Sequence, residues 1–177
     1  MSKRFFCLVV CVFVFACYSY GQGKDVDKLY NKARTKYTTG HFEEARDIYI
    51  DLLKKNPADF NLNYELGMLY FYELNDKATS VPYFETALKV MKDTVADLYN
   101  YLGQAYQSNL KYDQAIEMYN KYSAIPPKEG VIRISVKRYI DDCRREKSKL
   151  EEIVEKRNTQ SGVLQVLNLG PIVNSER

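Results

Sequence analysis

The apolar and polar positions of this chain repeat three times, over residues 29–57, 63–88 and 99–127. In the third stretch, Gly103 follows a leucine inside an apolar segment, and Ala115 lies among bulkier neighbours. Positions that are nearly free of side chain allow two helices to approach closely, because added bulk would force them apart. The stretch therefore predicts two antiparallel helices, A and B, joined by a turn.

The three stretches align in one register with a period of about 34 residues. The second stretch has one additional residue, which the pattern places in its turn, and Ser80 stands there where the other two have an alanine. The aligned positions hold Ala33, Gly40, Phe42, Ala45, Tyr49 and Pro57 in the first stretch, Leu66, Gly67, Tyr70, Phe84 and Ala87 in the second, and Leu102, Gly103, Tyr106, Ala115, Tyr119 and Pro127 in the third.

This pattern of L-G-x-x-Y, a later alanine, an aromatic residue four positions on and a closing proline resembles the tetratricopeptide repeat family. The resemblance covers about residues 26–127, with copies at about 26–59, 60–94 and 96–129. It implies an all-α fold, a helical-repeat solenoid of three helix pairs.

Seven residues are expected to pack the repeats together. Helix A of each copy contributes a small residue that meets helix B, helix B contributes an alanine in the first and third copies, and a tyrosine fills the volume beside the gap. A bulky residue at one of the small positions should therefore destabilise the fold. The set is Ala33, Gly67, Gly103, Ala45, Ala115, Tyr70 and Tyr106.

Residues 130–157 predict one long amphipathic helix, because apolar residues recur there at steps of three and four. A stacked repeat array needs a cap for its last copy, and this helix is expected to supply it. The alternative is a helix that binds a partner or dimerises. Cys143 is expected to pack as a small apolar residue on the inner face, and a reactive thiol is the alternative.

The chain begins with an export signal. Lys3 and Arg4 precede the apolar run FFCLVVCVFVFAC and then small residues, which predicts a signal peptide over residues 1–21 with cleavage after Gly21. The alternative is a bacterial lipoprotein, because VFAC, ending at Cys17, loosely resembles a lipobox. The expected localisation is export, to the periplasm or in association with an outer membrane.

Cleavage changes the cysteine count and the charge. It would leave Cys143 as the one cysteine of the mature chain, which excludes an internal disulfide. The formal net charge of +3 would fall to about +1, which argues against an electrostatic binder of nucleic acid.

Residues 158–177 change character: 158–162 predict a linker, and the apolar residues that follow favour a strand. The segment NLGPIVNSE resembles the junction at which tetratricopeptide repeats lead into a WD40-like propeller, often followed by an OmpA-like domain, in exported proteins of Bacteroidetes-type bacteria. This resemblance implies that the propeller and the peptidoglycan-binding parts lie outside this chain.

No group of residues predicts catalysis. His41 is the one histidine and is expected in a solvated turn, and the acidic pairs at 43–44 and 141–142 are expected on exposed helix faces. A nucleophile, base and orienting group cannot be assembled from these residues, and one Cys with one His does not make a zinc site. We therefore predict no enzyme, cofactor, metal or small-molecule substrate.

A binding surface is the better prediction. Stacked helix pairs curve, and their A helices line the concave side. Aromatic, methionine and arginine side chains there make good peptide anchors, although each of them has the alternative of packing between copies. The expected groove consists of Tyr30, Arg34, Tyr37, Tyr64, Met68, Phe71, Tyr72, Asn100, Gln104 and Gln107.

Some tetratricopeptide domains bind the C-terminal carboxylate of chaperones through Lys, Asn and Arg at set positions. Here these positions hold Tyr30, Arg34, Glu65, Asp97 and Tyr101. Two of the five are acidic, which disfavours that mode of binding.

The expected function is that of a non-catalytic scaffold that binds protein or peptide segments in the bacterial cell envelope, with a link to outer-membrane assembly or type IX secretion by analogy. The alternative is a structural spacer or tether of a larger envelope-anchored protein. Lipid on Cys17 would favour the tethered form, and a mature terminus at Gln22 the soluble form.

Overall fold

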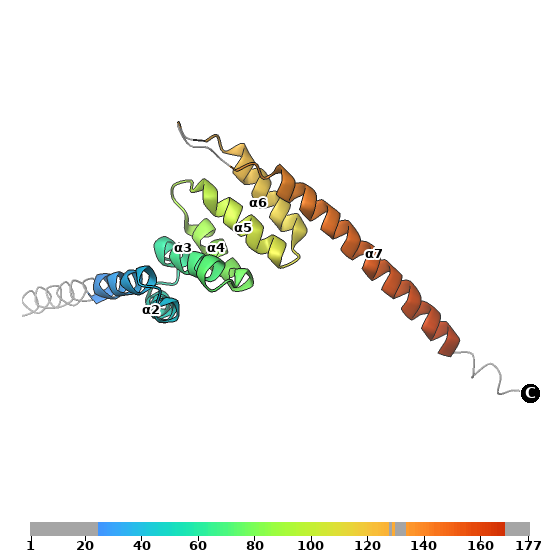
Figure 1. Ribbon diagram of the computed structural model, residues 1–177, viewed down its shortest axis with the longest axis horizontal. Helices are drawn as coiled ribbons and strands as arrows, with labels where there is room; N and C mark the ends of the chain where they lie inside the picture. The colour runs from blue at the N-terminus through green and yellow to red at the C-terminus, as the bar shows by residue number, and fades with distance from the viewer. Residues whose placement is uncertain (1–24, 128, 130–133, 169–177) are drawn as a thin grey trace, which may run out of the picture. The chain divides into compact units, whose positions relative to one another are not determined.

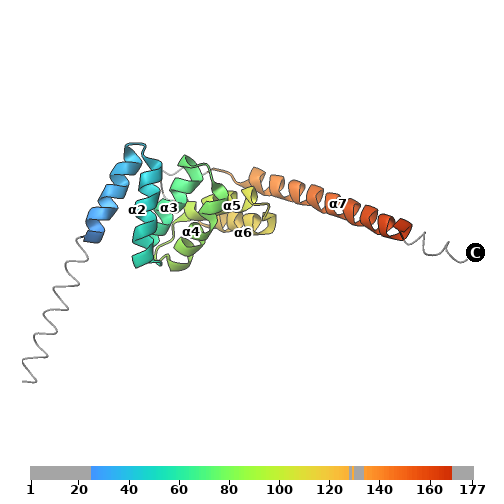
Figure 2. The same ribbon diagram turned by 90° about the horizontal axis from the view of Figure 1, so that it is seen from below.

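The computed structural model describes residues 25–127, 129 and 134–168, and every regular element within them is helical (Figures 1 and 2). They form two compact units that divide between Thr94 and Val95. The prediction of an all-α fold is confirmed for this part of the chain. The expected signal peptide at residues 1–21 lies outside it.

The first unit contains two helix pairs. A helix over residues 25–38 is followed by α2 (Phe42–Lys55). Next, α3 (Phe60–Met68) runs directly into the π-helical segment η1 (Leu69–Glu73), and α4 (Lys77–Val90) follows. α3 and η1 both pack along α4, and α2 contacts α3.

Local sequence explains where these helices begin. The Asp59 carboxylate accepts a hydrogen bond from the backbone N–H of Leu62, and that of Asp76 accepts one from Thr79, both at 3.0 Å. Each aspartate thereby satisfies a backbone donor that the first turn leaves free. α2 lacks such a cap, but two glutamates in its first turn interact favourably with the helix dipole.

Small residues bring the paired helices into contact. A β-carbon added to Gly67 in α3 would lie 2.6 Å from Cδ1 of Phe84 in α4. In the preceding pair, Ala33 and Ala45 are fully buried in one cluster with Tyr49. In both pairs, small residues thus lie beside a large aromatic ring.

Each helix pair turns at a residue with a positive φ angle. These residues are Gly40 (φ 77°), Asn75 (φ 49°) and Leu110 (φ 58°). Glycine adopts this conformation without steric cost and asparagine tolerates it, whereas for leucine it is strained. The three turns therefore share one backbone shape, although only the first has the glycine that a sequence pattern can recognise.

The additional residue of the second pair lies in η1. This pair has one residue more between Gly67 and Ser80 than the other pairs have between the corresponding positions. The backbone N–H of Leu74 bonds to the carbonyl of Leu69 at 3.0 Å, five residues back, as in a π-helix. The sequence placed this residue in the turn. The structure corrects that placement, because a wider last turn of helix A leaves Asn75 free to take the same left-handed position as in the other pairs.

The second unit contains the third helix pair and a long helix. α5 (Ala96–Ser108) packs against α6 (Tyr112–Ala124), and α7 (Lys137–Asn168) packs against α6. Between α5 and α6, a β-carbon added to Gly103 would lie 2.7 Å from Cε1 of Tyr119. The third pair thus uses the same small-residue and aromatic contact as the second.

Side chains from the first turns of α7 cover α6. Tyr139 stacks on Tyr119 with ring centroids 5.6 Å apart, and Cys143 is fully buried. Further along, Lys147 Nζ bonds both carboxylate oxygens of Asp113, at 2.7 Å and 2.8 Å. The apolar contact thus ends at an ion pair, after about three turns of helix.

Beyond this ion pair α7 differs from the prediction. The expected helix ended at residue 157, but α7 continues to Asn168, so a linker at 158–162 and a strand from 163 are wrong for the residues up to 168. A lone strand leaves its backbone groups without partners, whereas a helix satisfies its own. α7 also begins later than expected, at Lys137, and residues 130–133 and 169–177 lie outside the described part of the chain.

Three apolar side chains on this part of α7 are exposed, Leu150 (39%), Ile153 (55%) and Val154 (48%). Leu150 and Ile153 belong to the apolar positions, three and four residues apart, from which the amphipathic helix was predicted. They remain exposed because no described helix of the second unit reaches beyond the ion pair to cover them. In the described residues, no helix combines the length and the apolar character needed to cross a membrane.

Candidate functional site

A pocket of about 260 Å³ opens on the first unit, on the side formed by its A helices. The helix over residues 25–38 and α3 supply all of its lining residues but one, which comes from α2. Three tyrosine rings and a methionine form most of the wall, and one arginine and one glutamate bring charge. The lining residues are Arg34, Tyr37, Thr38, Tyr49, Tyr64, Glu65 and Met68.

The carboxylate of Glu65 joins the two helix pairs at this pocket. Tyr30 Oη donates a hydrogen bond to its Oε1 and Tyr49 Oη donates one to its Oε2, both at 2.5 Å. The two rings meet edge to face with centroids 6.2 Å apart, so their hydroxyls converge on one carboxylate. Arg34 Nε is 4.0 Å from Oε1, at the outer limit of an ion pair. Glu65 is therefore oriented by two neutral donors more than by the arginine.

Both tyrosines remain donors over a wide pH range. Burial, and then the hydrogen bond to Glu65 and its negative charge, raise the pKa of Tyr30 and of Tyr49 above the ordinary value for tyrosine. Neither hydroxyl therefore ionises near neutral pH. The pocket keeps a carboxylate in a fixed orientation.

A second carboxylate lies beside the pocket. Tyr37 Oη donates a hydrogen bond to Glu73 Oε1 at 3.1 Å. Burial, followed by this hydrogen bond and the charge of Glu73, raises the pKa of Tyr37. The ring of Tyr37 also meets that of Phe42 edge to face at 5.7 Å. Its position at the pocket is thus held from both sides.

Five of the residues that the sequence assigned to a groove gather here. Arg34, Tyr37, Tyr64 and Met68 line the pocket, and Tyr30 reaches it through Glu65. They converge because positions three, four and seven apart share one face of an α-helix.

Two further groove residues in this unit lie elsewhere. Phe71 is only 3% exposed and packs against Phe84, with ring centroids 6.0 Å apart, so its assignment to an open groove is wrong. Tyr72 is 53% exposed but is not among the pocket residues. Both lie in η1, whose wider turn departs from the α-helical register on which the sequence prediction relied.

In the second unit, the three amide residues assigned to the groove are bound within their own helix pair. Asn100 is 4% exposed, which corrects its assignment, and its Oδ1 accepts a hydrogen bond from Gln104 Nε2 at 3.3 Å. Gln107 accepts one from the Tyr119 hydroxyl at 2.8 Å. Gln104 and Gln107 are half-buried. These amides satisfy polar groups of the core, which single-helix periodicity does not reveal.

The small residues of the repeats are buried where the helices cross. Ala33, Ala45, Ala115, Gly67 and Gly103 all lie in the interior. The rings against the two glycines come from the B helices and belong to Phe84 and Tyr119. Tyr106 is buried, while Tyr70 is half-buried and stacks on Tyr83 with ring centroids 5.6 Å apart.

Sequence reasoning missed Thr38, Tyr49 and Glu65 as pocket residues. Glu65 appeared only as an acidic residue that argued against a carboxylate clamp, and Tyr49 only as an aligned position of the first repeat. The available signal was the hydroxyl of Tyr49, because a buried tyrosine needs a hydrogen-bond partner. That partner lies on another helix, so no spacing within one helix could identify it.

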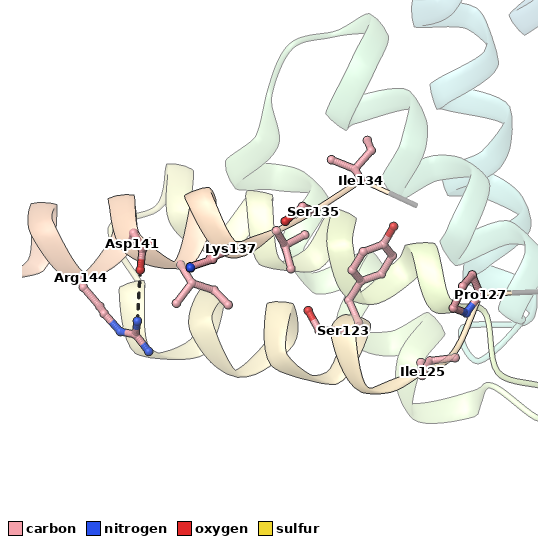
Figure 3. Close-up of a pocket in the computed structure, with 11 residues that line it drawn as sticks. Ser123, Ile125, Pro127, Ile134, Ser135, Lys137, Asp141 and Arg144 are labelled. Carbon is pink, nitrogen blue, oxygen red and sulfur yellow. Dashed lines mark hydrogen bonds and ion pairs between the residues drawn. The ribbon is translucent and has the colours of Figure 1, made fainter. Parts of the chain in front are cut away.

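The second unit has a hollow of about 420 Å³ between the end of α6 and the start of α7 (Figure 3). Ile125, Pro127 and Ile134 are among its apolar lining residues. At one end Arg144 donates a hydrogen bond to Asp141 at 3.2 Å, so these charges satisfy each other.

Within the described part of the chain, no three His, Cys, Asp or Glu side chains are placed to hold a metal ion. His41 is exposed, and its Nδ1 lies 3.0 Å from Thr39 Oγ1. Burial, with a smaller contribution from Asp142, raises the pKa of the Cys143 thiol to about 11, which opposes formation of a reactive thiolate.

Several solved structures share this fold. The first tetratricopeptide domain of Spaghetti (RPAP3) bound to the HSP90 peptide SRMEEVD is 17% identical, with a TM-score of 0.55 over 68% of this chain and 91% of that chain. MamA 41-end from Desulfovibrio magneticus RS-1 is 18% identical, with a TM-score of 0.57 over 85% and 78%. SycD, the type III secretion translocator chaperone of Yersinia enterocolitica, is 11% identical, with a TM-score of 0.52 over 73% and 86%. At these identities the likeness is one of fold.

A comparison with curated proteins found no match. Two sequence profiles of the tetratricopeptide repeat family match the chain, one over residues 30–89 and the other over residues 96–129, which together are more than half of its length. The matched regions cover most of the three helix pairs. The chain therefore belongs to the tetratricopeptide repeat family.

Proposed function

We propose that this protein is a non-catalytic scaffold that binds a segment of another protein in the pocket of its first unit. The observation that carries the proposal is the lining on the A-helix side, where Tyr37, Tyr64 and Met68 are half-buried and Arg34 is exposed. Such side chains offer large contact areas with few rotatable bonds and recur at protein interfaces. Their gathering on one face is more than the packing of two helix pairs requires.

The similar structures support binding of a peptide rather than of a small molecule. One of them holds an HSP90 peptide, and another is described as a chaperone of a secretion translocator. The pocket is also small, since sites for small molecules usually measure about 300–1,000 Å³. A single side chain of an extended partner fits this size better.

A photo-crosslinking experiment tests the proposal. A crosslinking amino acid replaces Thr38, which lines the pocket. In the control protein it replaces Asp51, an exposed residue of α2. We expect a defined crosslinked segment from position 38 only. That segment, made as a synthetic peptide, should bind the full chain and lose affinity with Tyr64→Ala and Met68→Ala. Equal crosslinking from both positions, or binding that is unchanged in both variants, would rule out the pocket as the binding site.

We further propose that the protein works in a bacterial envelope, with a link to outer-membrane assembly or type IX secretion. The support is the basic, apolar and small-residue order of residues 1–21 and the resemblance of the NLGPIVNSE segment to a propeller junction. Cell fractionation with mass spectrometry of the mature protein tests it. A terminus at Gln22 or a lipid on Cys17 supports export, and an intact terminus at Met1 in the cytoplasmic fraction contradicts it.

A structural spacer is the second candidate. The observation that favours it is α7, whose 32 residues span about 48 Å and which carries exposed apolar side chains from Leu150 to Val154. If the protein is a spacer, deletion of whole turns from α7 should impair the function of the protein, whereas Tyr64→Ala should leave that function unchanged. The two candidates therefore respond to different changes.

A further inference from the structure

The charges at the pocket of the first unit are mainly negative. Glu65 lines the pocket, and Glu73 holds the hydroxyl of Tyr37, which also lines it. Arg34 is the one cation among the lining residues. Two carboxylates against one guanidinium leave a net charge of about −1 at this site.

Arg34 does not firmly neutralise Glu65. Their nearest atoms are 4.0 Å apart, and the Arg34 side chain is 61% exposed. An ion pair of this kind contributes little, because water screens it and the long side chain must give up its freedom. The tyrosine hydroxyls that hold Glu65 in place supply hydrogen bonds but no charge, and a carboxylate can accept more than two. Glu65 therefore remains available to an incoming cation.

The walls of the pocket suit the rest of a basic side chain. The face of a tyrosine ring attracts a cation, and the half-buried Tyr37 and Tyr64 line the pocket. Met68 offers an adaptable apolar surface for an alkyl stem. Lysine and arginine combine such a stem with a charged head. A carboxylate in the same place would meet Glu65.

We propose that this pocket binds a lysine or arginine side chain of the partner segment, with Glu65 as its ion-pair partner and the tyrosine rings as its walls. This inference rests on the peptide-binding function proposed above and specifies the chemistry of the partner. An acidic segment bound through Arg34 is the opposing case. In that case, substitution of Arg34 should weaken peptide binding and substitution of Glu65 should not.

Two substitutions separate these cases without dismantling the pocket. Glu65→Gln removes the charge but retains an oxygen that accepts a hydrogen bond from a tyrosine hydroxyl. Arg34→Gln removes the cation that competes for Glu65 and is exposed enough to leave the packing intact. Glu44→Gln is the matched control, because it removes a carboxylate that pairs with Lys36 at 2.8 Å, and neither residue lines the pocket.

The test uses a displayed library of random 12-residue peptides selected on the full chain, with Tyr64→Ala as the counter-selection. Enriched peptides are then measured by fluorescence anisotropy, each beside a version with norleucine in place of its basic residue. We expect enrichment of Lys or Arg. The affinity for these peptides should fall about tenfold with Glu65→Gln in the protein or with norleucine in the peptide. It should stay the same or rise with Arg34→Gln, and it should stay the same with Glu44→Gln.

The outcomes distinguish this inference from the function on which it rests. The inference is wrong if the peptides that require Tyr64 are acidic or uncharged. It is also wrong if basic peptides bind Glu65→Gln as tightly as they bind the wild type. In both cases the proposed peptide-binding function still stands. A selection that yields no peptide dependent on Tyr64 overturns both. Circular dichroism of each variant shows whether the helices are retained, and a second conservative variant, Glu65→Asp, should bind basic peptides more tightly than Glu65→Gln does.

Discussion

The ring of Tyr119 lies directly against the backbone of Gly103: a β-carbon added to the glycine would be 2.7 Å from Cε1 and 2.8 Å from Cδ1 of the ring. Tyr119 is fully buried, and its hydroxyl donates to Gln107 Oε1 at 2.8 Å, so the ring is held in place. Gly67 and Phe84 meet in the same way in the second pair. The absence of a side chain is what allows these helices to touch.

Gly103→Ala should therefore lower the free energy of unfolding by about 1–3 kcal/mol, because the new methyl group overpacks a rigid contact. The effect opposes helix propensity, which favours alanine by about 1 kcal/mol. Urea unfolding followed by circular dichroism measures it. Ser108→Ala, an exposed change in the same helix, is the control. A Gly103→Ala protein as stable as the wild type would contradict the tight contact.

Leu110→Gly should raise the free energy of unfolding by roughly 0.5–1 kcal/mol, because relief of a strained left-handed leucine outweighs the added freedom of glycine in the unfolded chain. Leu110 is 58% exposed, so little burial is lost. Gly40→Ala should have the opposite sign and cost about 1–2 kcal/mol, although nothing lies within 4 Å of the added atom. Thermal and urea unfolding of both variants provide the measurement, and shifts of the same sign would contradict the shared turn geometry.

Deletion of Tyr72 should be tolerated and should lower the free energy of unfolding by less than about 2 kcal/mol. Tyr72 lies in η1 and is 53% exposed, and its removal would let the π turn return to α-helical spacing. Deletion of Gln104 from the middle of α5 should instead abolish cooperative unfolding of the second unit, because every later side chain of that helix would rotate. Unfolding curves and near-ultraviolet circular dichroism compare the two. Equal damage from both deletions would contradict the placement of the additional residue in η1.

Stability should decline at alkaline pH through Cys143. Burial raises the pKa of its thiol from an ordinary value of 9.0 to about 11. The unfolded chain therefore loses this proton first as the pH rises. The contribution of the protonated Cys143 thiol to the free energy of unfolding is fully present below about pH 9 and is lost between pH 9 and about 11. Cys143→Ala should flatten this part of the pH profile of the unfolding free energy.

The same burial protects the thiol. In the folded chain at pH 8, iodoacetamide should label Cys143 far more slowly than in urea, as peptide mapping by mass spectrometry would show. Equal rates in the two conditions would favour the reactive-thiol alternative.

Periodicity was sufficient to place half of the candidate site. Arg34, Tyr37, Tyr64 and Met68 lie on one face of their helices because of spacing alone, and the pocket forms on that face. The central carboxylate, Glu65, was not found this way. Its role depends on two tyrosines from different helices, whose distance from it in space has no counterpart in the local pattern.

The failures have similar causes. Phe71 and Tyr72 were placed by an α-helical register, which the π turn changes. Asn100 was taken as an exposed polar residue, whereas it lies in the interior with Gln104 as a hydrogen-bond partner. The end of α7 was set at a change of composition, although nothing after residue 157 prevented the helix from continuing to Asn168.

The amino-acid order by itself determined that this chain forms helix pairs and at which positions the two helices of a pair approach closely. Helical spacing and the lack of a side chain at Gly67 or Gly103 are local properties of the sequence. Tertiary structure alone decided which ring enters each gap, where the additional residue of the second pair is placed, and how Tyr30 and Tyr49 converge on Glu65. These outcomes depend on contacts between helices, whose energies are set by distances in space that no periodicity along one helix encodes.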